Sequence, residues 1–157
     1  MKRSVLVFSL LMYLGFASPV LCASESPIRW ESYSKALTAA QKDHKLIFVD
    51  IYADWCVPCR IMESNAFADK NTAKILNTRF HPVKLDVDSK DSILCDHKKN
   101  TPERCFFDVW ELNGVPSFVV IAPSGLTVLT LTQMLEPDEL RSLLFQFLEK
   151  EKEWILK

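Results

Sequence analysis

A pair of cysteines two residues apart is the feature that most constrains the fold of this chain. Cys56 and Cys59 lie in the segment Trp-Cys-Val-Pro-Cys-Arg, directly after the apolar, β-rich run 46–53. The residues after Cys59 can form a helix, so the pair lies at a predicted strand-to-helix junction. Free N–H groups and the helix dipole at a helix N-terminus favour the thiolate form of the first cysteine. The second cysteine can then attack a mixed disulfide formed by the first, which is thiol–disulfide exchange.

A Cys-x-x-Cys pair also occurs as one half of a zinc site. Cys95, His97 and Cys105 could supply further ligands, but their spacing does not form a standard second knuckle. Pro58 suits the first turn of a helix better than a zinc-knuckle turn that needs its backbone N–H groups. We therefore expect no metal, although the zinc alternative stays open.

The beginning of the chain has the pattern of a secretory leader. A short basic start is followed by the apolar stretch 5–16, and a cleavage site fits near Cys22 or Ala23. We therefore expect a signal peptide, residues 1–23, and a single domain, residues 24–157. An uncleaved anchor is the second choice, because a membrane-spanning helix needs about 20 residues and this apolar stretch is marginal. Lipidation of Cys22 is a further alternative.

Export would place the remaining cysteines in an oxidising compartment, where an even number of them favours disulfides. Besides the Cys-x-x-Cys pair, the domain holds Cys95 and Cys105, which bracket a polar segment without a core pattern. A bond between them would close a short surface loop and stabilise the fold by about 2–3 kcal/mol. The alternative is two free thiols, with Cys105 half buried beside two phenylalanines. We favour the disulfide because of the compartment.

The composition fits one globular domain and gives no reason to expect nucleic-acid binding. The 157 residues carry a net charge of -1 at pH 7, and 48% of them are hydrophobic. A nearly neutral chain has no broad electrostatic attraction to a polyanion or to a membrane. We expect a monomer.

The spacing of apolar residues predicts helices that alternate with strands. Ser32 could cap the first helix, and residues 89–112 form a helical or irregular crossover. The order predicts an α/β fold, with a central mixed β-sheet flanked by helices and an N-terminal helical extension. The predicted elements are a helix over 30–42, a strand over 46–53, helical segments after Cys59 and over 72–77, strands over 80–87, 117–122 and 126–132, and a helix from Pro137.

Three separated features resemble the thioredoxin superfamily. They are the Trp-Cys-x-Pro-Cys motif, an acid (Asp50) six residues before Cys56, and Gly114-Val115-Pro116 before a strand. Within the superfamily, residues 50–69 are most similar to the C-terminal periplasmic domain of the disulfide reductase DsbD and to free-standing relatives of the DsbH type. The chain departs from the DsbD domain at Pro58, where that domain usually has alanine.

The resemblance implies roles for the residues around the cysteine pair. Cys56 would be the nucleophile, and Cys59 the resolving thiol, which we expect to be the less exposed of the two. Asp50, whose pKa burial should raise, would move a proton to or from Cys59. Glu63, one helical turn after Cys59, would modulate the cysteine pKa values. The alternatives are an Asp50 that accepts backbone N–H groups at the strand end and a solvated Glu63.

The same resemblance implies a substrate-binding surface. A cis peptide bond is expected before Pro116, in a loop that faces the cysteines, and Val115 would offer strand-like hydrogen bonds to an extended substrate. Trp55 would shield the sulfurs and add an apolar contact surface, with ordinary core packing as its alternative. The three histidines have no partner pattern, and we interpret them as structural or surface residues: His44, His81 and His97.

The resemblance implies an exported, periplasmic thiol–disulfide oxidoreductase that acts as a reductant. Its substrates would be disulfide-bonded exported proteins, and its electron donor a membrane reductase of the DsbD or CcdA kind. Its redox group would be the Cys56–Cys59 disulfide, with no other cofactor. The alternatives are a disulfide oxidant or isomerase, a thiol reductase of cytochrome c maturation, and a non-catalytic thioredoxin-like binding module.

Overall fold

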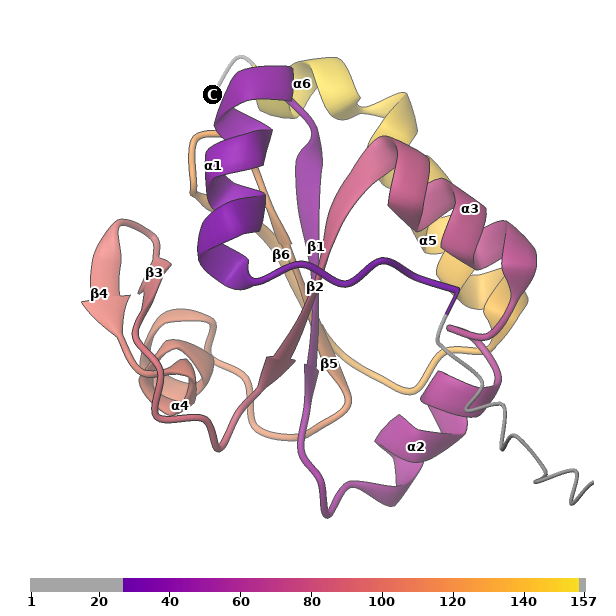
Figure 1. Ribbon diagram of the computed structural model, residues 1–157, viewed down its shortest axis with the longest axis horizontal. Helices are drawn as coiled ribbons and strands as arrows, with labels where there is room; N and C mark the ends of the chain where they lie inside the picture. Colours follow the sequence, from indigo (N-terminus) through magenta and orange to yellow (C-terminus); the bar gives the residue numbers. More distant parts are fainter. Residues whose placement is uncertain (1–26, 156–157) are drawn as a thin grey trace, which may run out of the picture.

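A four-stranded mixed sheet forms the centre of the computed structural model, which describes residues 27–155 (Figure 1). The strand order is β2-β1-β5-β6, with β1 parallel to β2 and antiparallel to β5, and β5 antiparallel to β6. The expected signal peptide, residues 1–23, and Cys22 lie outside the described residues. The strands are β1 (Leu46–Tyr52), β2 (Phe80–Asp86), β5 (Ser117–Ile121) and β6 (Thr127–Thr132).

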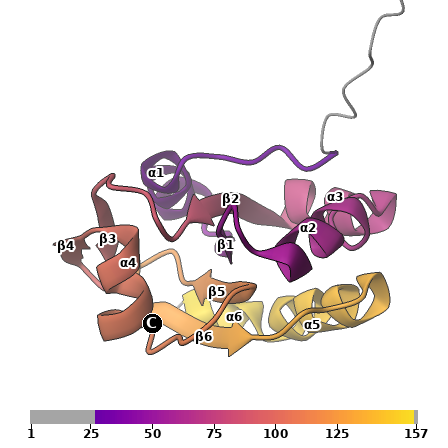
Figure 2. The same ribbon diagram turned by 90° about the horizontal axis from the view of Figure 1, so that it is seen from below.

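Helices cover both faces of this sheet, as the alternation of helices and strands predicts (Figure 2). The cluster of buried residues on one face joins α1 to the segment between β2 and β5. The cluster on the other face joins α2, α3 and α5. The helices are α1 (Tyr33–Asp43), α2 (Val57–Ser64), α3 (Lys70–Arg79), α5 (Pro137–Glu149) and α6 (Glu151–Ile155).

The helices α5 and α1 differ in how they begin. Pro137 opens α5, where a capping box joins Glu136 and Glu139. Ser32 stands at the N-cap of α1, but its side chain makes no cap hydrogen bond, so the predicted side-chain cap is wrong. Just before it, Glu31 forms a single parallel bridge with Val83 of β2.

The crossover between β2 and β5 contains a small hairpin that the sequence pattern does not predict. Strand β3 (Ile93–Cys95) pairs with β4 (Lys98–Asn100) through a turn whose two residues, Asp96 and His97, have φ values of 45° and 64°. Positive φ at both turn residues is typical of a tight two-residue hairpin. A one-turn helix, α4 (Pro102–Arg104), and a π-helical turn, η1 (Cys105–Val109), complete the crossover.

The position of Cys95 and Cys105 corrects the prediction of a surface loop. Both residues are completely buried, and they are joined by a disulfide with a Cα–Cα distance of 5.9 Å. They belong to the same apolar cluster as Phe106 and Trp110. The polar residues between the cysteines hide this burial in the sequence, because the hairpin directs its lysines to solvent while both sulfurs point into the core.

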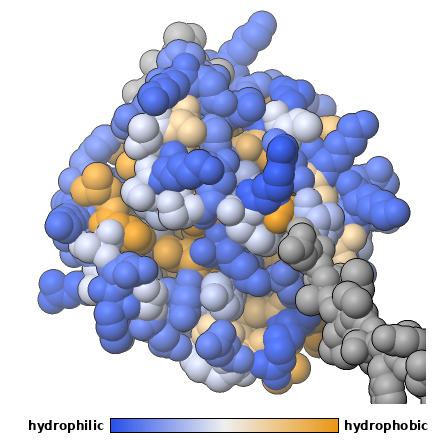
Figure 3. Space-filling view, viewed as in Figure 1, coloured by the Kyte–Doolittle hydropathy of each residue, from blue (hydrophilic) through white to orange (hydrophobic). Residues whose placement is uncertain are grey.

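One part of the visible surface is hydrophobic. Leu37, Ile93 and Leu94 line a groove of about 450 Å³ between α1 and β3, where hydrophobic side chains gather in the space-filling view (Figure 3).

Among residues 27–155, none of the helices combines the length and the apolar character needed to cross a bilayer.

His81 on β2 is structural, as predicted, but it has partners that the sequence pattern does not reveal. Its Nδ1 lies 3.1 Å from a carboxylate oxygen of Glu31, and its Nε2 lies 3.0 Å from one of Asp43. Partial burial raises the pKa of Asp43, but hydrogen bonds from His81 and Lys45 outweigh it and hold that pKa below its usual value. The imidazole of His81 thus connects β2 to both ends of α1: to Asp43, its last residue, and to Glu31, which precedes its first turn.

Candidate active site

The two cysteines of the Cys-x-x-Cys motif lie where β1 passes into α2. Cys56 is the N-cap of α2, and its backbone N–H donates to the carbonyl oxygen of Ala53 at 3.0 Å. The backbone N–H of Cys59 donates to the Cys56 sulfur at 3.1 Å, and the two sulfurs form a disulfide. Pro58 fits within the first turn, where no helical partner for its missing N–H is needed. A thiolate at Cys56 would be stabilised by the backbone N–H of Cys59 and by the helix dipole.

The exposure of the two cysteines differs from the expected order. Cys56 has an exposed fraction of 2% and Cys59 one of 9%, although we expected Cys59 to be the less exposed. Cys56 is more covered because its side chain, at the N-cap, folds back over the first turn of α2 toward the Cys59 amide. Motif spacing alone does not report this side-chain direction.

Asp50 is a buried carboxyl group beside the cysteine pair. Only 3% of this residue is exposed, and it lines a cavity of about 180 Å³ together with Cys59, Glu63 and Lys84. Burial raises the pKa of Asp50 to about 7; Lys84 lowers it and Glu63 raises it further. Among the described residues none donates a hydrogen bond to this carboxyl group, so only the charge of Lys84 counters the effect of burial, and the alternative of a strand-end acceptor has no support.

Lys84 is a site residue that the sequence analysis missed. It pairs in register with Asp50 across the parallel strands β1 and β2. Its ammonium group forms an ion pair with Glu63 and lies 4.8 Å from the ring centroid of Tyr52. The signal was present in the sequence, because aligning the two predicted strands in parallel places this lysine beside Asp50. Glu63 is therefore half buried and paired, and the alternative of a solvated helix residue is wrong.

Trp55 lies at the surface beside the cysteines. It is 68% exposed, so the alternative of ordinary core packing is wrong. Its indole N–H donates to a carboxylate oxygen of Asp88 at 2.9 Å, a partner that sequence analysis did not identify. Val57 and Ile61, on the first turns of α2, are also exposed, so several apolar side chains are exposed next to the disulfide.

The proline loop lies at the same end of the sheet as the cysteines. Ser117, the first residue of β5, pairs with Ile51 near the end of β1, so the preceding loop lies beside the strand that leads to Cys56. The Val115–Pro116 peptide bond is cis, as the resemblance implies. The Ser117 hydroxyl donates to the carbonyl oxygen of Gly114 at 2.5 Å, which fixes the turn from inside.

The four cysteines of residues 27–155 form two disulfides, Cys56–Cys59 and Cys95–Cys105. Within residues 27–155, no group of three or more His, Cys, Asp or Glu side chains is arranged to hold a metal ion. A dithiol pair beside a buried carboxyl group of raised pKa supplies a nucleophile, a resolving thiol and a proton acceptor.

Known proteins are similar to this chain in sequence and in fold. Thiol:disulfide interchange protein DsbD 2 of Pseudomonas aeruginosa is 33% identical over 92 residues, which cover 58% of this chain and 14% of that protein. The structure of a DsbH oxidoreductase superposes with a TM-score of 0.61 at 21% identity, covering 88% of this chain and 94% of the other. A thioredoxin from Thermus thermophilus has a TM-score of 0.64 at 22% identity, with 80% and 90% covered.

These similarities confirm the α/β thioredoxin fold predicted from the sequence. The matched residues span only a small part, 14%, of the length of the DsbD relative. The family model Thioredox_DsbH, described as a protein of unknown function (DUF255), matches residues 15–145. Since this match spans most of the sequence, the chain belongs to the Thioredox_DsbH family of thioredoxin-like proteins.

Proposed function

We propose that this protein is an exported thiol–disulfide oxidoreductase that reduces disulfide bonds in other exported proteins. The observation that carries the proposal is the Cys56–Cys59 pair at the start of α2, with the Cys56 sulfur held at the Cys59 amide. The similarity to a thiol:disulfide interchange protein supports the same chemistry.

The reaction has two steps. In the first, the Cys56 thiolate attacks one sulfur of the substrate disulfide, forming a mixed disulfide and releasing the other substrate sulfur as a thiolate that takes a proton from water. In the second, Cys59 loses its proton and attacks the Cys56 sulfur, which releases the second substrate thiolate and closes the Cys56–Cys59 disulfide. Two electrons pass to the substrate, and the structure describes the resulting oxidised protein.

Asp50 would accept the proton of Cys59 in the second step. Both residues line the same cavity, whose volume of about 180 Å³ exceeds the share of one water molecule, about 30 Å³. A water in this cavity could carry the proton between them. A carboxyl group with a pKa of about 7 can both accept and release a proton near neutral pH. Lys84 and Glu63 would adjust that pKa in opposite directions.

The substrate would bind across the surface formed by α2 and the proline loop. Trp55, Val57 and Ile61 present exposed apolar groups next to the disulfide. Val115 is half buried, and its backbone would pair with an extended substrate segment in the manner of an added strand. Backbone pairing would accept many sequences, as a general protein-disulfide reductase requires.

The crossover between β2 and β5 supports the reductive direction of the proposed reaction. A bulky helical insertion would favour an oxidant of the DsbA type, whereas the crossover between β2 and β5 holds a hairpin and two short helical turns. The oxidised pair must be reduced after each turnover, and we assign this step to a membrane reductase of the DsbD or CcdA kind. The protein would work in the periplasm as a monomer.

Trapping the intermediate with insulin tests this proposal. A Cys59→Ala variant keeps the nucleophile but lacks the resolving thiol, so we expect it to form a covalent adduct with insulin that persists until a reductant is added. The adduct would be measured by mass spectrometry and non-reducing gels. The matched control is the Cys56→Ser/Cys59→Ala double variant, which should form none. An adduct of equal yield in the control would contradict the proposal.

A further inference from the structure

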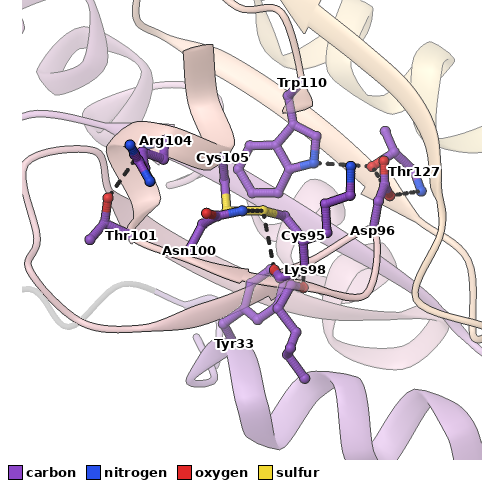
Figure 4. Close-up of a disulfide and its surroundings, with 11 residues drawn as sticks. Tyr33, Cys95, Asp96, Lys98, Asn100, Thr101, Arg104, Cys105, Trp110 and Thr127 are labelled. Atoms are coloured by element: carbon purple, nitrogen blue, oxygen red, sulfur yellow. Dashed lines mark hydrogen bonds between the residues drawn. A yellow bond between two sulfur atoms is a disulfide. The ribbon is translucent and has the colours of Figure 1, made fainter. Parts of the chain in front are cut away.

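The second disulfide, Cys95–Cys105, is separate from the reacting pair, yet it is connected to the proline loop. Cys105 is the first residue of η1, and its sulfur is bonded to the last residue of β3 (Figure 4). Both cysteines are completely buried, so solvent reductants do not reach them in the folded protein. The bond therefore fixes the start of η1 to the hairpin.

The end of η1 is fixed by a second set of bonds. The indole N–H of Trp110 donates to the hydroxyl oxygen of Thr127 at 3.0 Å. The carboxylate of Asp96, the residue after Cys95, accepts from both the backbone N–H and the hydroxyl of Thr127 at 2.8 Å. The close-up shows Asp96 and Trp110 meeting at Thr127 (Figure 4). One residue of β6 therefore holds the hairpin turn and the end of η1 together.

The hairpin itself is anchored to the body of the domain. The hydroxyl of Tyr33, on α1, donates to the carbonyl oxygen of Leu94 at 2.7 Å, next to Cys95. The turn residue His97 packs against Gly125, which lies in the turn between β5 and β6 and has a φ of 91°. The hairpin is thus a fixed support for η1 rather than a free loop.

The π-helical turn η1 also holds the segment that follows it and leads to the proline loop. The carbonyl oxygen of Phe106 accepts a hydrogen bond from the backbone N–H of Leu112 at 2.9 Å. Between them Glu111 has a φ of 53°, a conformation that a non-glycine residue keeps only where its surroundings determine it. Leu112 is buried, and Val115, three residues later, packs against the same apolar cluster as the disulfide.

We propose that the Cys95–Cys105 disulfide is a positioning element that fixes η1 and thereby sets where Val115 presents its backbone to a protein substrate. This inference rests on the proposed function of the cysteine pair and concerns substrate binding rather than the redox step. Without the bond, the start of η1 would be less ordered before substrate binds, and ordering it on binding would cost affinity. A small disulfide that needs no backbone pairing would react as before.

Kinetics with two probes test this proposal. In a Cys95→Ala/Cys105→Ala variant we expect the KM for insulin to rise about tenfold with kcat little changed, since a misplacement of about 1 Å can cost up to about 100-fold. The rate with the small disulfide 5,5′-dithiobis(2-nitrobenzoic acid) should stay at the wild-type value. The matched control is Leu144→Ala, which opens a comparable gap in the opposite core and should leave both KM values unchanged.

A second variant covers the case in which the double variant does not fold. Thr127→Val keeps the disulfide and the side-chain volume but removes the hydroxyl that joins Trp110 to Asp96, so it should raise the KM for insulin in the same direction by less. A wild-type KM in the folded double variant, or in Thr127→Val if the double variant is unfolded, would overturn the proposal. So would equal loss of rate with both probes. An inactive wild-type protein would instead refute the proposed function.

Discussion

Replacing Cys56 by serine should lower the rate of insulin reduction by about 10³-fold or more, to the background rate of the assay. A serine hydroxyl stays protonated at neutral pH, so it cannot replace the thiolate as nucleophile. The change is nearly isosteric at a residue that is 2% exposed, so the fold should be kept. The measurement is the rate of insulin precipitation with dithiothreitol as the source of electrons.

The matched control for this variant is Cys59→Ser. It keeps the attacking thiolate and should complete one attack, giving a mixed disulfide without further turnover. In the absence of dithiothreitol, only the control should therefore consume one equivalent of a disulfide probe. If Cys56→Ser retained more than about a tenth of the wild-type rate, Cys56 would not be the nucleophile.

Replacing Asp50 by asparagine should slow turnover by about 100-fold at pH 7, the lower end of what a positioned proton acceptor contributes. Asparagine has nearly the same shape, so the cavity shared with Cys59 should persist. The wild-type rate should change around pH 7, following the raised pKa of Asp50, and the variant should lose this inflection. Asp54→Asn, at an exposed carboxylate of the same motif, is the matched control and should keep it.

The Asp50→Asn substitution should also raise the free energy of unfolding, and this gain should grow as the pH rises. Because burial raises the pKa of Asp50 from 3.8 to about 7, the folded protein holds a proton that the unfolded chain releases between these values. The resulting stability is fully present below pH 4 and is lost as the pH rises through about 7, at a cost of up to about 4 kcal/mol. In urea, Asp50→Asn should therefore be more stable than wild type at pH 8 and show little difference at pH 4. An equal difference at both pH values would contradict a buried, protonated Asp50.

Much of the fold was predictable because its core elements are long and periodic. The apolar run at β1 is buried, and so are Leu140 and Leu144 of α5, in the positions that their spacing indicates. The position of the cysteines between β1 and α2 followed from the same run, because the motif begins where the strand ends. Asp50 stood out as an acid within an apolar strand, and its burial follows from that position.

The remaining features depend on contacts between segments that are distant in sequence. Strands of three residues, such as β3 and β4, are too short to show a period, so the hairpin was invisible. Lys84 could be placed beside Asp50 only by aligning the two predicted strands in parallel, and the bond from Trp55 to Asp88 requires the path of a turn. The burial of Cys95 and Cys105 arises from packing that no local pattern encodes.

The measurement that tests the central claim most directly is the reduction potential of the Cys56–Cys59 couple. It would be determined by equilibration with glutathione buffers, in protein that lacks residues 1–23 and retains the Cys95–Cys105 disulfide. We expect a value near about -270 mV, as in thioredoxin, which suits a reductant that a membrane donor keeps reduced. A value near about -120 mV, the range of DsbA, would contradict this account and make the protein an oxidant.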